Sequence, residues 1–189
     1  FWYFIRMRKN RLKEIFKSGK SAVNGWLQIP NSFTAELMAN QNWDSLTLDM
    51  QHGVIDYPNA VGMLQAISTT QVVPMARVNW NEPGQIMKIL DAGAYGIIIP
   101  QINSKNQLQD IISRSLYYPN GERGVGYSRS NLYGLNIGQD LNLKLNPIII
   151  AQKTTKIQIL SEFIVNSFWQ FYKMPADSKR YYFQNSFKY

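Results

Sequence analysis

Short apolar segments alternate with helix-length segments five times between residues 23 and 164. The apolar segments have the length of β-strands, and two of them are continuous runs of isoleucine. The five pairs are Val23–Gln28 with Ser32–Asn40, Ser45–Met50 with Asn59–Thr69, Val72–Val78 with Glu82–Ala92, Gly96–Gln101 with Ser104–Leu116, and Pro147–Gln152 with Thr155–Ile164. This order predicts parallel strands joined by crossover helices, and therefore an α/β fold.

The alternation alone is compatible with either a closed barrel or an open doubly wound sheet. Unusual polar residues occur at or just after the carboxyl ends of four of the expected strands, namely Asp49, His52, Arg77, Gln101 and Gln152. The active sites of (β/α)8 barrels are built at the carboxyl ends of successive strands. A nucleotide-binding doubly wound sheet would instead need a glycine-rich turn after its first strand, and residues 28–31 contain no glycine. The polar residues therefore favour a barrel.

The length of the chain limits how much of a barrel it can form. A complete (β/α)8 barrel takes about 250 residues, whereas this chain has 189. A short amphipathic helix over Arg11–Lys20 precedes the five clear units, and a sixth unit is less regular. We therefore predict a single domain over residues 1–189 with an incomplete barrel of five to six strand–helix units.

The chain has no cysteine and one histidine, His52. The lack of cysteine excludes disulfides, thiolate nucleophiles and cysteine-bound zinc or iron–sulfur sites, and it permits a reducing cytoplasm, where we expect the protein to reside. Any metal would be bound by oxygen or by the one imidazole. A lone histidine is more often a surface or structural residue than a catalyst, but a position directly after a strand favours acid–base chemistry for His52.

The net charge of +8 lies at the two ends of the chain. Residues 1–20 carry seven Lys or Arg and one Glu, and residues 153–189 carry six basic and two acidic side chains. Residues 21–152 carry seven basic and nine acidic side chains, which argues against a nucleic-acid-binding face. The apolar run Phe1–Ile5 is too short to span a membrane, and its basic residues follow it, so we expect neither a membrane span nor a secretory signal.

A long connection between Tyr117 and Asn146 contains five glycines together with Arg123 and Arg129. The stretch from Gly121 to Gly126 could bind an anion through backbone amides and arginine. It could equally be a surface loop, because glycine-rich loops are common. The sequence leaves both interpretations open.

Five stretches of the chain resemble, in order and spacing, the HpcH/HpaI aldolase/citrate lyase family. They are Asn42-Trp43-Asp44 with Leu48-Asp49-Met50-Gln51-His52-Gly53, Ala76-Arg77-Val78-Asn79, Leu90-Asp91-Ala92-Gly93 with Ala94-Tyr95-Gly96 and Ile97-Ile98-Ile99-Pro100, Tyr118-Pro119-Asn120-Gly121 with Glu122-Arg123-Gly124-Val125-Gly126, and Ile149-Ile150-Ala151-Gln152. The resemblance covers residues 8–152. It implies a barrel of the phosphoenolpyruvate/pyruvate type and aldol chemistry in which a divalent metal holds pyruvate as its enolate.

The resemblance also implies roles for individual residues. His52 would be the general base acting through a bound water, and Asp91 would increase its basicity. Arg77 would stabilise the enolate, Gln152 would contact the substrate, and Asp49 would help to order the water near His52. The residue types suit these roles, because imidazole exchanges protons near neutral pH and arginine remains cationic.

The sequence departs from the family after Gln152. The family's metal-binding Glu corresponds to Thr154, and a neutral hydroxyl is a poor replacement for a carboxylate on a hard cation. Further on, Met174 stands where a glycine is expected, before Ala176, an implied substrate contact, and Asp177, the second implied metal ligand. We therefore treat residues 153–189 as a divergent segment and hypothesise a truncated or altered copy of a family member.

The resemblance implies a lyase that cleaves 4-hydroxy-2-oxo acids into pyruvate and an aldehyde with Mg²⁺, Mn²⁺ or Co²⁺. Its expected partners are a small 2-oxo acid and further copies of itself, since the resemblance implies hexamers. Two alternatives remain open. One is a non-catalytic remnant that cannot hold metal, and the other is a citrate lyase-like relative that acts on acyl-CoA.

Overall fold

The computed structural model describes residues 9–134, 147–152, 170–172 and 181–184. The strands are β1 (Ala22–Leu27), β2 (Ser45–Asp49), β3 (Val73–Arg77), β4 (Gly96–Ile99), β5 (Ile148–Gln152), β6 (Gln170–Tyr172) and β7 (Tyr181–Gln184). The helices are α1 (Arg11–Lys17), α2 (Ser32–Ala39), α3 (Tyr57–Ile67), α4 (Pro83–Asp91), α5 (Lys105–Ser115) and the short 3-10 helix η1 (Arg129–Asn131).

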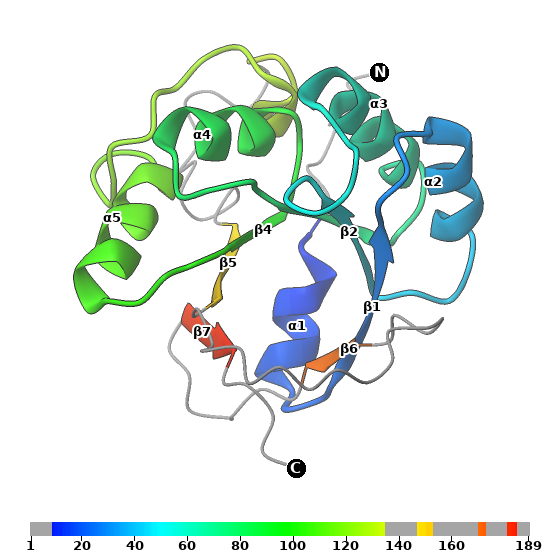
Figure 1. Cartoon of the computed structure of the whole chain (residues 1–189), viewed down its shortest axis with the longest axis horizontal. Coiled ribbons are helices and arrows are strands. Elements are labelled where there is room, and N and C mark those ends of the chain that lie inside the picture. The colour runs from blue at the N-terminus through cyan, green and yellow to red at the C-terminus, as the bar shows by residue number, and fades with distance from the viewer. Residues whose placement is uncertain (1–8, 135–146, 153–169, 173–180, 185–189) are drawn as a thin grey trace, which may run out of the picture.

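All seven strands form one sheet in the order β6-β1-β2-β3-β4-β5-β7. Strands β1 to β5 are parallel and lie side by side in chain order. Strand β7 pairs with β5 in parallel, whereas β6 pairs with β1 in the antiparallel sense. Figure 1 shows the strands curving into an arc, with α2 to α5 outside it and α1 inside it.

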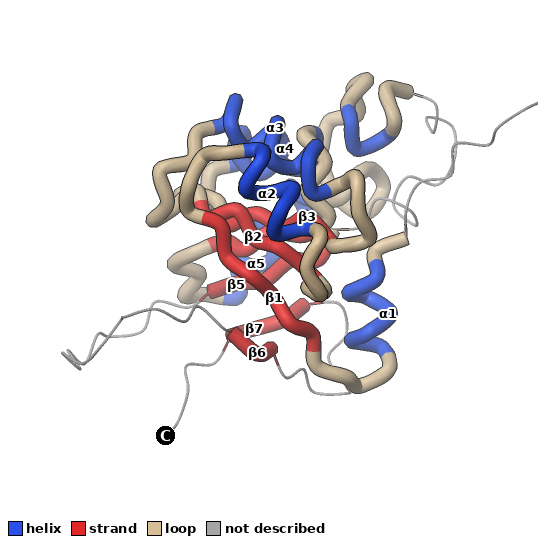
Figure 2. The backbone as a smooth tube through the Cα atoms, turned by 90° about the vertical axis from the view of Figure 1, so that its right-hand side faces the viewer, coloured by secondary structure: helices blue, strands red, loops and turns tan. Residues whose placement is uncertain are grey.

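Each face of the sheet has its own apolar core. The outer core packs α2 to α5 against the sheet and includes Leu46, Leu48, Ile97 and Ile99, all fully buried. The inner core places Leu12 and Phe16 of α1 among side chains from the first positions of β1, β3 and β5. Helix α1 therefore covers the amino-terminal end of the inner face and leaves the carboxyl-terminal end for polar side chains. Figure 2 shows α2, α3 and α4 together on one side of the strands, away from α1.

Each outer helix begins with a polar cap close to a strand's carboxyl end. Asn31, Asp56 and Glu82 accept hydrogen bonds from backbone N–H groups in the first turns of α2, α3 and α4. Ser104 and Gln107 form a capping box at the start of α5. These caps fix where each helix begins, so that the loops between strand and helix stay short at the edge where the polar residues gather.

The predicted α/β fold is confirmed. All five expected strands occur within one or two residues of their predicted bounds, and the expected first helix ends at Lys17 rather than Lys20. The fifth expected helix, over 155–164, lies outside the described residues. The antiparallel pairing of β6 departs from the all-parallel order of a complete barrel. Among the described residues, no helix has both the length and the apolar character needed to cross a membrane.

Candidate active site

Polar side chains end three of the parallel strands on the same face of the sheet. Asp49 ends β2, Arg77 ends β3 and Gln152 ends β5. Side chains alternate between the two faces of a strand, and Met75 and Ile150, two residues earlier, belong to the inner core. Arg77 and Gln152 therefore face the inside of the arc, at the end that α1 leaves uncovered.

Asp49 and Arg77 form a buried bidentate ion pair across neighbouring strands. They are paired in the β2–β3 register. The Nε of Arg77 donates to Oδ1 of Asp49 at 2.9 Å, and its Nη2 donates to Oδ2 at 2.6 Å. The Asp49 side chain is fully buried and that of Arg77 is 12% exposed. Such fork geometry fixes the orientation of the guanidinium as well as its position.

One edge of the Arg77 guanidinium remains available. The guanidinium carbon lies 4.6 Å from the ring centroid of Trp26 on β1, a stacking contact that holds its plane. Nε and Nη2 bind Asp49, whereas Nη1 makes no hydrogen bond with the described residues. The paired carboxylate and the ring thus leave Nη1 as the donor that an anion or enolate oxygen can reach.

Asp49 also holds the turn that carries His52. Its Oδ1 accepts hydrogen bonds from the backbone N–H groups of Gln51 and His52, both at 3.1 Å. The N–H of Gly53 donates to the backbone carbonyl of Asp49 at 3.1 Å, and that of Val54 donates to the carbonyl of Gln28 at 3.0 Å. The backbone of His52 is therefore fixed, while its imidazole is exposed and makes no hydrogen bond with the described part of the chain.

Gly53 is required by the tightness of this turn. A Cβ atom at residue 53 would overlap the backbone oxygen of Asp49 and lie 3.0 Å from the Cα of Gln28. Both are backbone atoms and cannot rotate away. The turn that places His52 next to the ends of β1 and β2 therefore requires glycine at position 53.

The Asp49 carboxyl is held in its charged form. Burial alone would raise its pKa, but hydrogen bonds from Arg77 and from the His52 backbone, the charge of Arg77 and the amide of Gln28 outweigh burial. The pKa of Asp49 therefore lies below its ordinary value of 3.8. An ionised carboxylate with all these donors is a structural anion that orients its neighbours, not a proton acceptor near neutral pH.

Gln152 lies at the same edge, two strands away from Arg77. Its side chain is partly buried, and its carbonyl accepts a hydrogen bond from the N–H of Ile102 at 2.9 Å. That bond ties the loop after β4 to the end of β5. Gln101, directly before Ile102, has a φ of +59°, which is unusual for a residue with a side chain.

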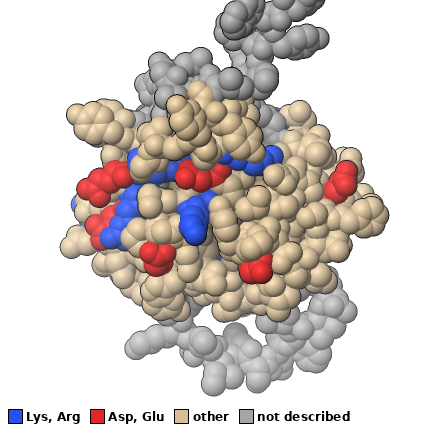
Figure 3. All heavy atoms as spheres, turned by 90° about the horizontal axis from the view of Figure 1, so that it is seen from above, with Lys and Arg blue, Asp and Glu red and all other residues tan. Residues whose placement is uncertain are grey.

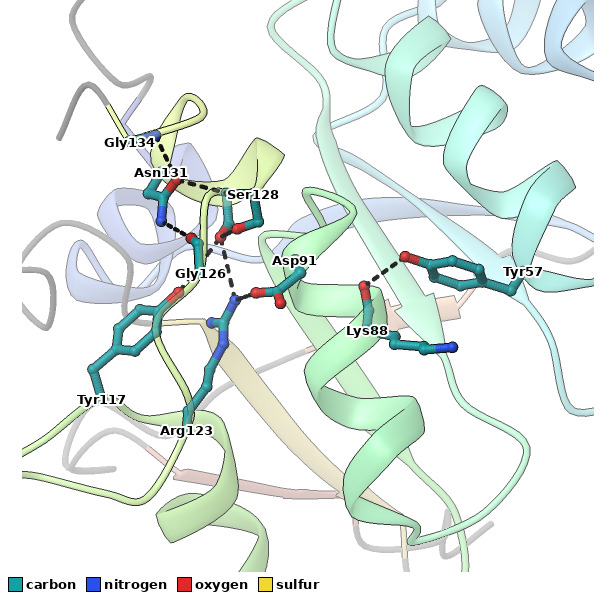
Figure 4. A network of polar contacts seen from close by, with 10 residues as sticks. Tyr57, Lys88, Asp91, Tyr117, Arg123, Gly126, Ser128, Asn131 and Gly134 are labelled. Carbon is teal, nitrogen blue, oxygen red and sulfur yellow. Dashed lines mark hydrogen bonds and ion pairs between the residues drawn. The ribbon is translucent and has the colours of Figure 1, made fainter. Parts of the chain in front are cut away.

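Asp91 does not lie beside His52 within this chain, contrary to the implied dyad. It is the last residue of α4, which begins after the carboxyl end of β3 and runs back toward the amino-terminal ends of the strands. Its Oδ1 accepts a hydrogen bond from Nη2 of Arg123 at 2.6 Å (Figure 4). The antiparallel course of each outer helix separates its end from the site, and motif spacing does not reveal this separation.

The glycine-containing connection packs against α4. Arg123 is buried, binds Asp91 and Ser130, and stacks on Tyr117 with 4.5 Å between its guanidinium carbon and the ring centroid. Figure 4 shows this network beside the end of α4. Arg129 donates to the carbonyl of Ala92 at 3.3 Å. Both arginines thus have partners within the protein, and Nε of Arg123 is buried without a hydrogen-bond partner among the described residues.

The described residues do not provide a divalent metal site. No group of three or more His, Asp or Glu side chains comes together in the described ranges. Asp49, the carboxylate at the strand ends, is occupied by Arg77, Gln28 and two backbone amides. Thr154, Ala176 and Asp177 lie outside the described residues. The oxygen and nitrogen donors of the described residues therefore do not fit a hard divalent cation.

Acidic and basic side chains lie intermixed on the face shown in Figure 3, where red and blue groups neighbour one another. That face does not present a continuous basic surface.

Two residues of the site were not singled out from the sequence. Trp26 stacks on Arg77, and Gln28 donates through Nε2 to Oδ2 of Asp49 at 3.2 Å. Gln28 ends the first expected strand. It could therefore have been singled out in the same way as Asp49, Arg77 and Gln152, the polar residues at the ends of other strands. The ring contact of Trp26 depends on strand pairing and had no such signal.

Comparison with known proteins identifies the family. The model of the HpcH/HpaI aldolase/citrate lyase family matches residues 24–166. The hydroxypyruvate/pyruvate aldolase of Rhizorhabdus wittichii is 40% identical over 126 residues, which is 66% of this chain and 50% of that protein. The 4-hydroxy-2-oxo-heptane-1,7-dioate aldolase of Salmonella arizonae is 35% identical over 118 residues, 62% of this chain and 45% of that protein.

A solved structure supports the same assignment. An HpcH/HpaI aldolase/citrate lyase family protein from Burkholderia cenocepacia superposes with a TM-score of 0.68 and 27% identity, over 76% of this chain and 59% of that one. The predicted incomplete barrel is thereby confirmed. This chain spans about half the length of the curated relatives it matches. It belongs to the HpcH/HpaI aldolase/citrate lyase family.

Proposed function

We propose that this chain carries the proton-transfer and enolate-binding part of a carbon–carbon lyase that cleaves 4-hydroxy-2-oxo acids into pyruvate and an aldehyde. The observation that carries the proposal is the Asp49 carboxylate, which binds the Arg77 guanidinium and the backbone of His52 at once. A fixed cation and an exposed imidazole at one strand edge suit a reaction that makes an enolate. The aldolase names of the relatives support this reaction class.

The residues would act in sequence on a bound 4-hydroxy-2-oxo acid. Nη1 of Arg77 would bind the 2-oxo oxygen, and the imidazole of His52, through a water, would accept the proton of the 4-hydroxyl. The C3–C4 bond would then break. C4 would leave as the carbonyl carbon of the aldehyde, and the electron pair of the broken bond would stay with C3 to form the pyruvate enolate. Arg77 would stabilise the enolate oxygen, and the proton held by His52 would return to C3 to give pyruvate.

The metal requirement rests on the resemblance alone. It implies Mg²⁺, Mn²⁺ or Co²⁺, with Asp177 as a ligand, Thr154 at the other ligand position, and Gln152 and Ala176 as substrate contacts. Of these four residues the structure describes only Gln152. No step above is assigned to a metal, but the proposal includes a requirement for one of these ions. A homo-oligomer likewise remains a prediction.

The test is pyruvate release from 4-hydroxy-2-oxoheptanedioate, followed with a coupled dehydrogenase. We expect release that requires one of the three cations, stops with a chelator, and falls at least about 100-fold in His52→Ala and Arg77→Met. Lys88→Met, on the exposed surface of α4, is the control and should keep full activity. Turnover that continues in chelator, or no turnover by a well-folded chain, would contradict the proposal.

A non-catalytic relative is the alternative that one observation favours. Thr154 replaces the expected carboxylate, and the described residues hold no cluster of metal ligands. Calorimetric titration with Mn²⁺ separates the two cases, because an active chain must bind the ion. If only Thr154→Glu binds Mn²⁺, the chain is an impaired enzyme. The acyl-CoA relative remains a second alternative, although Arg123 binds Asp91 and Arg129 donates to the carbonyl of Ala92.

A further inference from the structure

We propose that Gln28 is a positioning residue that acts through Asp49 to keep Arg77 and His52 in a single fixed arrangement. The inference rests on the proposed function, because it concerns the same site. It adds a residue that lies outside the catalytic set implied by the resemblance. Gln28 follows β1 directly, and both its side chain and its backbone contact the segment that ends β2.

The contacts of Gln28 join two strand ends. Its Nε2 donates to Oδ2 of Asp49 at 3.2 Å, and its carbonyl accepts the N–H of Val54 at 3.0 Å. A Cβ at residue 53 would lie 3.0 Å from both the Cα and the carbonyl oxygen of Gln28. The turn over 49–54, which carries His52, is therefore pressed against Gln28 on one side and bound to Asp49 on the other.

Gln28 completes the hydrogen bonding of Asp49. Oδ1 has three donors, namely Nε of Arg77 and the backbone N–H groups of Gln51 and His52. Oδ2 has two donors, which are Nη2 of Arg77 and Nε2 of Gln28. Asp49 is fully buried, so water does not replace a donor that is removed. Without Gln28, Oδ2 would be held by Arg77 alone, and the carboxylate could tilt toward it.

A tilt of this carboxylate would reach both reacting groups. It would rotate the guanidinium that presents Nη1 and would lengthen the bonds that hold the backbone of His52. Small displacements of the Arg77 guanidinium or of His52 would reduce the reaction rate strongly even if the protein remained folded. The amide of Gln28 suits the task because it supplies a donor without adding a charge beside the ion pair.

The variant Gln28→Met keeps the length of the side chain and removes the donor. We expect kcat for pyruvate release to fall about 10-fold while the chain remains folded at the assay temperature, with a somewhat lower melting temperature because a buried donor is lost. Gln28→Glu should lose more at neutral pH, since a second carboxylate would face Asp49, and should recover partly at acidic pH, where the protonated acid again donates. Among the described residues, Gln28 binds the titratable Asp49, Arg77 binds the same carboxylate, and His52 lies on the turn that packs against Gln28. Gln71→Met, at an exposed position before β3, is the matched control.

A second readout does not depend on turnover. In Gln28→Met, NMR should show a raised pKa for the Asp49 carboxyl and shifted signals of the Arg77 Nε–H and the His52 backbone N–H, with none of these changes in Gln71→Met. If the wild-type chain releases no pyruvate, the proposed function fails, and these signals still decide the role of Gln28. Signals and kcat that match the wild type in Gln28→Met would overturn the inference.

Discussion

The Asp49 carboxylate receives two hydrogen bonds from Arg77, at 2.9 Å from Nε and 2.6 Å from Nη2. Both side chains lie at the carboxyl ends of neighbouring parallel strands, and both are largely shielded from water. The same carboxylate holds the backbone N–H of His52. One buried anion thus connects the cation and the imidazole of the candidate site.

Removing one partner of this ion pair should destabilise the fold. Asp49→Asn would leave the Arg77 guanidinium buried without a counter-charge, and we expect a loss of about 3 kcal/mol in the free energy of unfolding. The double variant Asp49→Asn/Arg77→Met should lose much less than the sum of the losses in Asp49→Asn and Arg77→Met. Urea unfolding of the single and double variants measures this coupling. Additive losses would show that the two side chains do not act as a pair.

The contribution of the pair should depend on pH in a defined direction. The pKa of Asp49 in the folded chain lies below its ordinary value of 3.8. The stabilisation is therefore complete above that value and is lost as the pH falls from it toward the folded pKa. The difference in unfolding free energy between wild type and Asp49→Asn should stay constant from neutral pH to about pH 5 and shrink below pH 4. A difference that instead disappears between pH 6 and 7 would refute this assignment.

A methyl group at residue 53 should disturb the turn of His52. Gly53→Ala places a Cβ against backbone atoms of Asp49 and Gln28, and we expect a loss of about 1–3 kcal/mol in stability together with a shifted His52 backbone signal. Gly124→Ala is the matched control, because a Cβ there meets no atom within 4 Å. Thermal unfolding of both variants tests the expectation, which equal melting temperatures would exclude.

Replacing Gln101 with glycine should stabilise the fold. Its φ of +59° places a side chain in the left-handed region, at a cost of about 1–2 kcal/mol that glycine does not incur. After the greater chain entropy of glycine is subtracted, we expect a gain of up to about 1 kcal/mol. Gln109→Gly, at an exposed position in α5, should lose about 1 kcal/mol. Chemical denaturation compares them, and a destabilised Gln101→Gly would contradict the strain argument.

The sequence predicted the elements of the fold because the apolar runs are strongly periodic. The isoleucine runs of β4 and β5 are buried on both faces, as their continuity indicated. It also predicted that Asp49, Arg77 and Gln152 gather at one edge, since parallel strands share an edge at their carboxyl ends. The antiparallel β6 had no such signal, because its three residues carry no pattern of alternation.

Individual partners were harder to predict than positions. Asp91 belongs to a motif in register with Arg77, yet it is bound to Arg123, because α4 carries it to the opposite end of the strands. The ion pair between Arg123 and Asp91 joins residues 32 positions apart in the chain. It could not be predicted from motif spacing, because it depends on how the connection after α5 folds against α4. Gln28 could have been found as one more polar residue at a strand end, but its hydrogen bond to Asp49 required the pairing of β1 with β2.

The most direct measurement of the central claim is exchange of the C3 protons of pyruvate for deuterium, followed by proton NMR in D₂O with Mg²⁺ present. This half-reaction needs no aldehyde. In the proposed mechanism it depends on His52 as the acid–base group and on the Arg77 guanidinium, which stabilises the enolate. The account predicts exchange by the wild-type chain that His52→Ala and Arg77→Met abolish and that Lys88→Met retains. Exchange that persists in His52→Ala, or none by a folded wild-type chain, would contradict it.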